Sequence, residues 1–172
     1  MTLHELNILP KEQLKEELFK CCGSVNWVER MLPFFPADDL VELLEDAEEQ
    51  WWKCTEADWL EAFTHHPKIG DIDSLKKKFA STAQWAAGEQ SGAVAASDDV
   101  LKALAEGNDQ YEKKFGYIFI VCATGKSADE MLQLLQKRLQ NKKEDEIEIA
   151  ADEQSKITKL RLEKLLDITW DN

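Results

Sequence analysis

Long hydrophobic runs are absent from this sequence of 172 residues. No apolar stretch approaches the roughly 18 residues that a membrane-spanning helix needs, so we expect no transmembrane segment. The N-terminus lacks a charged segment followed by an apolar one, and the C-terminus carries no Ser-Lys-Leu address. We therefore predict neither secretion nor peroxisomal import.

Positive charge is scarce: 21 Lys and Arg residues face 34 Asp and Glu residues, for a formal net charge of -13. This balance disfavours nucleic-acid binding and binding to anionic membranes, because both require a basic surface. A small anionic ligand remains compatible, since a pocket can be locally cationic on an acidic protein.

Cysteine is also scarce, and its spacing does not indicate a metal site or a disulfide framework. The four residues are Cys21, Cys22, Cys54 and Cys122, with no Cys-x-x-Cys pair. Adjacent cysteines have poor disulfide geometry. We expect reduced, mostly buried thiols and a cytoplasmic protein.

Strand-like sequence is nearly absent. Only residues 115–123 are rich in aromatic and β-branched residues. Because a lone strand has no partner, we expect this segment to be a buried helix or an extended core segment. Most of the remaining chain shows helical periodicity. The sequence predicts an all-α fold, a single-domain helical bundle of about eight helices over residues 1–172.

Several helix boundaries follow from capping signals. Pro10 is expected to begin an early amphipathic helix, and Ser127 is expected to cap a later one. Asp98 or Asp99 is the candidate cap between them. The final helix is predicted over about residues 144–167.

The segment 63–71, Phe-Thr-His-His-Pro-Lys-Ile-Gly-Asp, holds two of the three histidines. Pro67 biases His66 toward an extended conformation, and Gly70 permits the following turn. The His66 imidazole would project from a locally fixed backbone, and imidazole suits proton transfer near neutral pH. The alternative is a helix C-terminus with histidines placed near its dipole.

Arg161 interrupts an apolar stripe on the final helix. A guanidinium facing the core needs an anionic partner or a cavity. It could form an ion pair with one of the acidic residues, or it could bind a ligand carboxylate in a bidentate manner. The stripe comprises Ile147, Ala150, Ala151, Gln154, Ile157, Leu165 and Ile168.

Glu89 and Gln90 lie in a segment of small residues, 83–97. They could be an exposed acid–amide pair or a hydrogen-bonding pair for a ligand. A carboxylate, an amide, an imidazole and a guanidinium together suit a polar, urea-like ligand that bears a carboxylate.

The order of these segments resembles the 2-oxo-4-hydroxy-4-carboxy-5-ureidoimidazoline (OHCU) decarboxylase family. The resemblance covers the chain from Leu9 to about Leu166. It rests on His66-Pro67-Lys-Ile-Gly70, Glu89-Gln90, Asn108-x-x-Tyr111-x-x-x-Phe115-Gly116, Phe119 and Lys156-Ile-x-x-Leu-Arg161-Leu162.

The resemblance implies an activity, the last step from urate to (S)-allantoin, with OHCU as the small-molecule substrate. It also implies an all-helical bundle that dimerises and uses no metal or organic cofactor. His66 would be the catalytic proton donor, assisted by Glu89, and Arg161 would orient the substrate. The implied substrate-binding residues are Pro67, Ala86, Ala87, Gly88, Glu89, Gln90, Phe119, Ile120, Val121, Cys122, Ala123 and Arg161.

Two departures from the family pattern stand out. Ala86 occupies a position where the family often has a hydroxyl residue, so one hydrogen bond to substrate could be absent or made by a neighbour. Tyr117-Ile118 replaces a common Phe-Pro, which changes the entry into segment 119–123. Neither departure affects His66, Glu89 or Arg161.

Two other functions are compatible with the residues. A metal-dependent hydrolase could use His65, His66, Asp71 and Asp73, although adjacent histidines converge poorly and no HExxH motif occurs. A non-catalytic helical interaction module could use the six tryptophans as anchors. Tryptophans at helical spacing, however, more often belong to the core.

Overall fold

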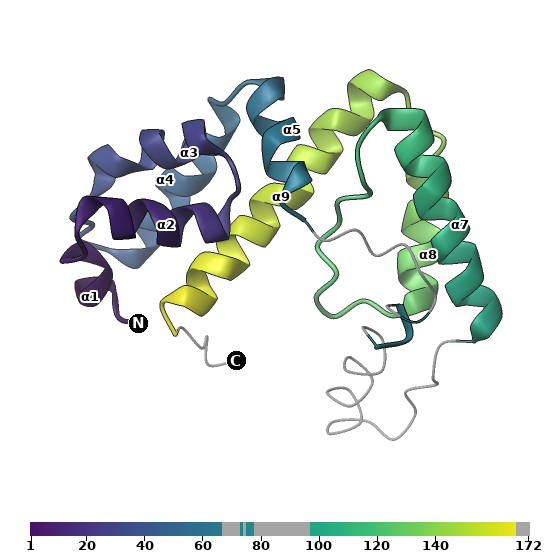
Figure 1. Cartoon of the computed structure of the whole chain (residues 1–172), viewed down its shortest axis with the longest axis horizontal. Helices are drawn as coiled ribbons and strands as arrows, with labels where there is room; N and C mark the ends of the chain where they lie inside the picture. Colours follow the sequence, from purple (N-terminus) through teal and green to yellow (C-terminus); the bar gives the residue numbers. More distant parts are fainter. Residues whose placement is uncertain (67–72, 74, 78–96, 168–172) are drawn as a thin grey trace. The chain divides into compact units, whose positions relative to one another are not determined.

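The structure, a computed structural model, describes residues 1–66, 73, 75–77 and 97–167 (Figure 1). These residues contain helices and connecting segments but no β-strand, which confirms the predicted all-α class. The helices are α1 (Leu3–Asn7), α2 (Lys11–Cys21), α3 (Val25–Met31), η1 (Leu32–Phe34), α4 (Leu40–Trp52), α5 (Glu56–Thr64), α7 (Asp98–Phe115), α8 (Ala128–Arg138) and α9 (Lys143–Leu165).

The described residues divide into two compact units. Unit 1 comprises residues 1–66, 120–122 and 149–167, and unit 2 comprises the described residues from 73 to 119 together with 123–148. In unit 1, α3 packs against α2, α4 and α5, and in unit 2 α7 packs against α8. None of the described helices is both long and apolar enough to cross a membrane.

Tryptophans form much of the centre of unit 1. Trp27 and Trp51 are buried, and each indole N–H donates to a backbone carbonyl, that of Ala47 at 2.9 Å and that of Ala151 at 2.8 Å respectively. A buried indole N–H that lacked a partner would be costly, so these bonds allow the rings to occupy the core. The second bond also fixes α9 against α4 within this unit.

Capping side chains set most helix starts. Pro10 precedes α2 and Ser127 caps α8 through a capping box with Glu130, as predicted. The predicted cap at Asp98 or Asp99 is wrong, because Ser97 caps α7 by accepting a hydrogen bond from the Val100 N–H. The two aspartates instead occupy the first turn, where carboxylates favour the positive end of the helix dipole.

The segment after α7 is not helical, so of the two expected conformations the buried helix is wrong. Gly116 ends α7 in the left-handed region, with φ of 88°. Residues 118–123 then adopt neither helix nor strand, and within them Ile120 and Cys122 are buried. β-branched side chains restrict χ1 and favour extended backbone, which explains the outcome.

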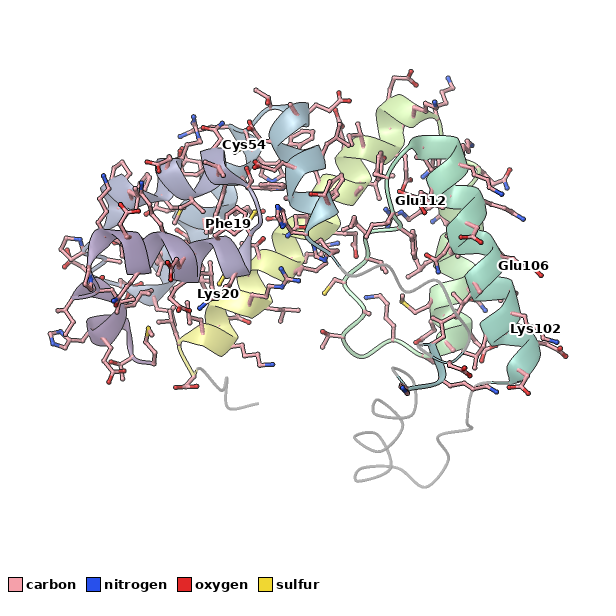
Figure 2. The ribbon with its side chains drawn as sticks, in the orientation of Figure 1. Phe19, Lys20, Cys54, Lys102, Glu106 and Glu112 are labelled. Atoms are coloured by element: carbon pink, nitrogen blue, oxygen red, sulfur yellow. The ribbon has the colours of Figure 1, made fainter. Side chains whose placement is uncertain are left out.

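The four cysteines form no disulfide and are buried, as expected. Burial raises the pKa of Cys22 to about 12, so its thiol is protonated at neutral pH. On α7, Lys102 and Glu106 are exposed, and Figure 2 labels both on this helix. The final helix runs from Lys143 to Leu165, within two residues of the predicted bounds.

Candidate functional site

His66 lies directly after α5 in unit 1, and its neighbour His65 anchors it. His65 is the C-cap residue of α5, and its ring packs edge-on against Phe19 with centroids 5.0 Å apart. A Cβ built on Gly23 would lie only 2.6 Å from the His65 Cβ. The chain therefore approaches α2 closely at this point, and the His66 N–H donates back to the Phe63 carbonyl at 3.3 Å.

The His66 ring contacts α9. Its Nε2 lies 2.5 Å from Oε1 of Gln154, a residue with no exposed surface. The Gln154 amide in turn donates to the Thr158 hydroxyl at 3.1 Å. A half-buried imidazole is thus held by a buried carboxamide that has its own partner one helical turn further along.

Burial lowers the pKa of His66 below its ordinary value of 6.5, and the nearby positive charge of Arg161 lowers it further. The hydrogen bond with Gln154 raises the pKa, and His65 lowers it. The imidazole is therefore neutral in the free protein near pH 7. Its conjugate acid is a stronger acid than an exposed imidazolium, which suits transfer of a proton to carbon.

Arg161 is half-buried beside His66 on the same unit. Its Nη1 donates to the carbonyls of Lys20 and Cys21, at 3.4 and 3.3 Å, at the C-terminal end of α2. Figure 2 labels Lys20 at this helix end. No carboxylate among the described residues forms an ion pair with Arg161, so the predicted internal ion pair is not seen in that part of the chain.

The apolar stripe on α9 differs from the prediction by a small rotation. Ile147, Ala150, Ala151 and Gln154 are buried as expected, but Arg161 and the predicted Ile157 and Leu165 are only half-buried. The buried face continues instead through Thr158, Leu162 and Leu166. A repeat of four residues drifts slowly around a helix of 3.6 residues per turn, which shifts the stripe by one position.

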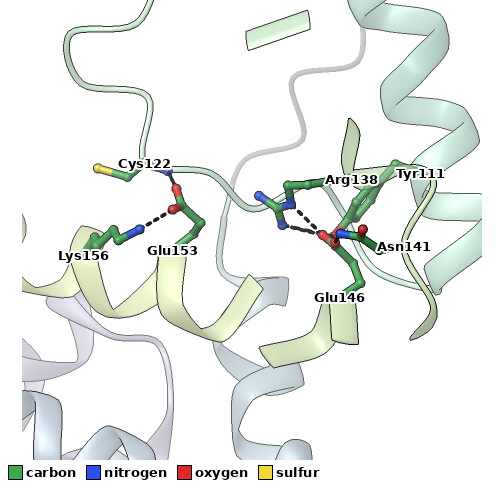
Figure 3. A network of polar contacts seen from close by, with 7 residues as sticks. All are labelled: Tyr111, Cys122, Arg138, Asn141, Glu146, Glu153 and Lys156. Carbon is green, nitrogen blue, oxygen red and sulfur yellow. Dashed lines mark hydrogen bonds and ion pairs between the residues drawn. The ribbon is translucent and has the colours of Figure 1, made fainter. Parts of the chain in front are cut away.

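Segment 119–123 is the other described part of the predicted site. In unit 1, the Cys122 N–H donates to Glu153 Oε2 at 2.7 Å, and Glu153 Oε1 pairs with Lys156 Nζ at 2.6 Å (Figure 3). This contact attaches the extended chain to α9 one residue before Gln154. In unit 2, the Phe119 ring lies under the Arg138 guanidinium, 4.6 Å from the ring centroid.

The remaining predicted site residues lie outside the described part of the chain. These are Pro67 and the segment Ala86, Ala87, Gly88, Glu89 and Gln90. Asp71, from the alternative metal site, also lies outside it. Within the described residues, no group of three His, Cys, Asp or Glu side chains could hold a metal ion.

A second polar cluster is buried in unit 2 and was missed by the sequence analysis (Figure 3). Arg138 contacts Glu146 through Nε and Nη2, both at 2.6 Å, and Glu146 has no exposed surface. Tyr111 donates to the same carboxylate at 2.5 Å, and the Asn141 amide donates to its other oxygen at 2.8 Å. Both carboxylate oxygens have partners, so this cluster is structural in character.

The chain matches the model of the family described as OHCU decarboxylase over residues 7–163. It is 42% identical over 155 residues to the uric acid degradation bifunctional protein TTL of Arabidopsis thaliana, covering 88% of this chain and 47% of that protein. It is 24% identical to a 2-oxo-4-hydroxy-4-carboxy-5-ureidoimidazoline decarboxylase of Halalkalicoccus jeotgali, covering 96% of this chain and 92% of that one.

A solved structure is also similar, the "crystal structure of OHCU decarboxylase in the presence of (S)-allantoin". The TM-score is 0.70 and the identity 38%, covering 89% of this chain and 99% of that chain. The chain spans about half the length of the Arabidopsis relative and about a third of a bifunctional Bacillus relative, 47% and 32% respectively.

Proposed function

The chain belongs to the OHCU decarboxylase family, and on this premise we propose that it converts OHCU to (S)-allantoin and carbon dioxide in urate degradation. The observation that carries the proposal is the His66 imidazole, half-buried, held by Gln154 and adjacent to Arg161. These groups supply a proton carrier and a cation for a carboxylate-bearing substrate.

In this reaction the bond between the ring carbon and the departing carboxylate breaks and carbon dioxide leaves. The electron pair enters the adjacent carbon–nitrogen system of the substrate, so the substrate itself accepts the charge. The neutral His66 imidazole takes the proton of the hydroxyl group on the decarboxylated carbon as that oxygen becomes the product carbonyl, while a solvent proton neutralises the ring nitrogen. His66 then delivers its proton to the neighbouring, ureido-bearing ring carbon from a fixed side, which sets the (S) configuration. Arg161 orients an anionic or carbonyl group, and Glu89 and Gln90 hold the ureido and ring N–H groups.

The experiment generates the unstable substrate in situ from urate and follows (S)-allantoin by circular dichroism. His66→Ala should lower turnover by about 10²–10⁴-fold with the fold intact, and His65→Ala should lower it much less. Equal losses would contradict the assignment of His66 as the proton donor. An unchanged decay of the intermediate with wild-type protein would contradict the activity and favour an interaction module.

The other roles are proposed on the family resemblance. Pro67, segment 86–90 and segment 119–123 would contact the substrate, residues 1–172 would act as one domain, and catalysis would proceed in the presence of a chelator. A cytoplasmic location is supported by four cysteines that form no disulfide. For the proposed homodimer, sedimentation at micromolar protein should give about twice the chain mass of 19.7 kDa. A clean monomer would refute the dimer and leave the activity standing.

A further inference from the structure

Histidine has two ring nitrogens. The hydrogen-bond partner of one nitrogen fixes the tautomer and so decides whether the other nitrogen can exchange a proton with a ligand. In unit 1, the partner of His66 Nε2 is the Gln154 carboxamide at 2.5 Å. Because Gln154 is fully buried, this side of the ring faces protein rather than a ligand. Among the described residues, no hydrogen-bond partner is seen for the other ring nitrogen, Nδ1.

The carboxamide orientation follows from what an acid–base histidine requires. A protonated imidazole donates from both nitrogens, so the group facing Nε2 must accept a hydrogen bond in both protonation states. Gln154 Oε1 meets this requirement, and its amide nitrogen then donates to the Thr158 hydroxyl at 3.1 Å. In the reverse orientation an N–H of the amide would face the N–H of the imidazolium.

Resting on the proposed decarboxylase function, we propose that Gln154 is a positioning residue that holds His66 as the Nε2-protonated tautomer and makes Nδ1 the atom that exchanges the proton with substrate. Thr158 fixes the carboxamide in turn, one helical turn along α9. Gln154 does not touch the reacting atoms in this arrangement, so it acts only through His66.

A neutral carboxamide is suited to this position. A carboxylate there would strongly favour the charged imidazole. It would oppose the lowering of the His66 pKa that burial, the charge of Arg161 and the neighbouring His65 cause. Gln154→Glu should therefore raise the pKa of His66. Gln154→Leu should remove the acceptor and leave Nε2 without a partner.

The first measurement does not depend on activity. Long-range ¹H–¹⁵N correlation spectra of ring-labelled protein should show His66 as the Nε2–H tautomer in the wild type. In Gln154→Leu, the signals should shift toward a mixture of the two tautomers. If the wild type shows the Nδ1–H tautomer, or if Gln154→Leu leaves the spectrum unchanged, the inference is overturned even when the enzyme is active.

The second measurement uses the decarboxylation assay. Gln154→Leu should lower kcat by about 10–100-fold with a small change in KM, because the proton carrier is displaced rather than the substrate contacts. Thr158→Val should lower kcat by a smaller factor. Gln154→Glu should move the limb of the pH–rate profile that reports His66 to higher pH, and this variant decides the question if Gln154→Leu fails to fold.

The matched control is Gln50→Leu. Gln50 is another buried glutamine in unit 1, on α4, and no hydrogen bond joins it to His66 among the described residues. Its replacement should leave both the tautomer and kcat unchanged. An equal fall in kcat in both Leu variants would overturn the positioning role, and an inactive wild type with the expected spectra would overturn the proposed function alone.

Discussion

Gly23→Ala tests whether the close approach of α2 to the His65–His66 segment matters for catalysis. Gly23 directly follows the end of α2, and a Cβ built on it would lie 2.6 Å from the His65 Cβ and 2.8 Å from Cγ and Cδ2 of the same ring. A rotation of the ring can move Cγ and Cδ2 but not Cβ. The clash must therefore be relieved by a shift of backbone.

The size of the shift follows from these distances. Ordinary van der Waals contact begins at 3.4 Å, so the two chains must separate by about 0.8 Å or more. If His65 moves, the adjoining His66 moves with it. If Gly23 moves instead, the end of α2 moves, and with it the Lys20 and Cys21 carbonyls that hold Arg161.

A displacement near 1 Å at a catalytic group can cost about 10²-fold in rate, and extra atoms in a packed site cost about 1–3 kcal/mol of stability. We therefore expect Gly23→Ala to lower kcat/KM by about 10–100-fold. The melting temperature should fall by about 2–4 °C for each kcal/mol lost. Turnover is measured by formation of (S)-allantoin, and stability by thermal unfolding.

Two further variants make this result specific. Gly107→Ala places a Cβ 2.6 Å from Cδ2 of Leu135 in unit 2, but that atom is a methyl group at the end of a flexible side chain. Its activity should match the wild type. His65→Gly combined with Gly23→Ala removes the clashing Cβ and should restore much of kcat/KM. Wild-type kcat/KM in Gly23→Ala, or no restoration in the double variant, would refute the reasoning.

Three other predictions follow from the structure. Arg161→Lys and Arg161→Gln should each lower kcat/KM by at least about tenfold. The loss of stability should be near 1 kcal/mol, because only two long hydrogen bonds to carbonyls are lost. Near-normal turnover with a large fall in melting temperature would contradict a substrate role. The pKa of His66 in the folded protein lies below 6.5, so its contribution to stability is present above pH 6.5 and is lost as the pH falls through the folded pKa. The free energy of urea unfolding of His66→Gln should lack this pH-dependent contribution. An identical pH dependence in both proteins would contradict the prediction. Glu146→Gln should destabilise by about 3–5 kcal/mol in urea unfolding because Arg138 keeps an unpaired buried charge, whereas Arg138→Met with Glu146→Leu should recover most of that loss.

Local signals in the sequence predicted the helices well and their exact starts less well. Ser127 is predicted as a cap because it stands shortly before the apolar repeat that begins at Met131, and in the structure it forms a capping box with Glu130. At the start of α7, by contrast, Ser97, Asp98 and Asp99 are three adjacent residues that can each act as a cap. Choosing among them depends on the path of the preceding chain, which local sequence does not specify.

Composition was informative about burial but not about conformation in segment 115–123. Aromatic and β-branched residues there predicted a core segment, and Ile120 and Cys122 are indeed buried. The same residues suit a buried helix, a strand and an extended segment, so the pattern left the conformation open. The hydrogen bond from Cys122 to Glu153 joins residues 31 apart and decides it through tertiary contact.

The same limit explains why the Arg138–Glu146 pair was missed. Both residues lie on predicted helices. Arg138 falls within the apolar repeat of its helix, beside Leu134 and Leu135, but nothing in the local pattern identifies Glu146 as its buried partner. Only the turn between α8 and α9 brings them together, so that Tyr111 and Asn141 can complete the cluster. Charged residues are expected on surfaces, and the exceptions are determined by packing.

Gln154 lies in the predicted apolar stripe of the final helix together with Arg161. A carboxamide on a buried face also needs partners. Positions 154, 158 and 161 differ by four and three residues and so share one side of a helix, which makes the spacing of amide, hydroxyl and guanidinium a property of α9 itself. What the sequence did not contain is the contact with His66, 88 residues away, which turns this row of polar side chains into support for a proton carrier.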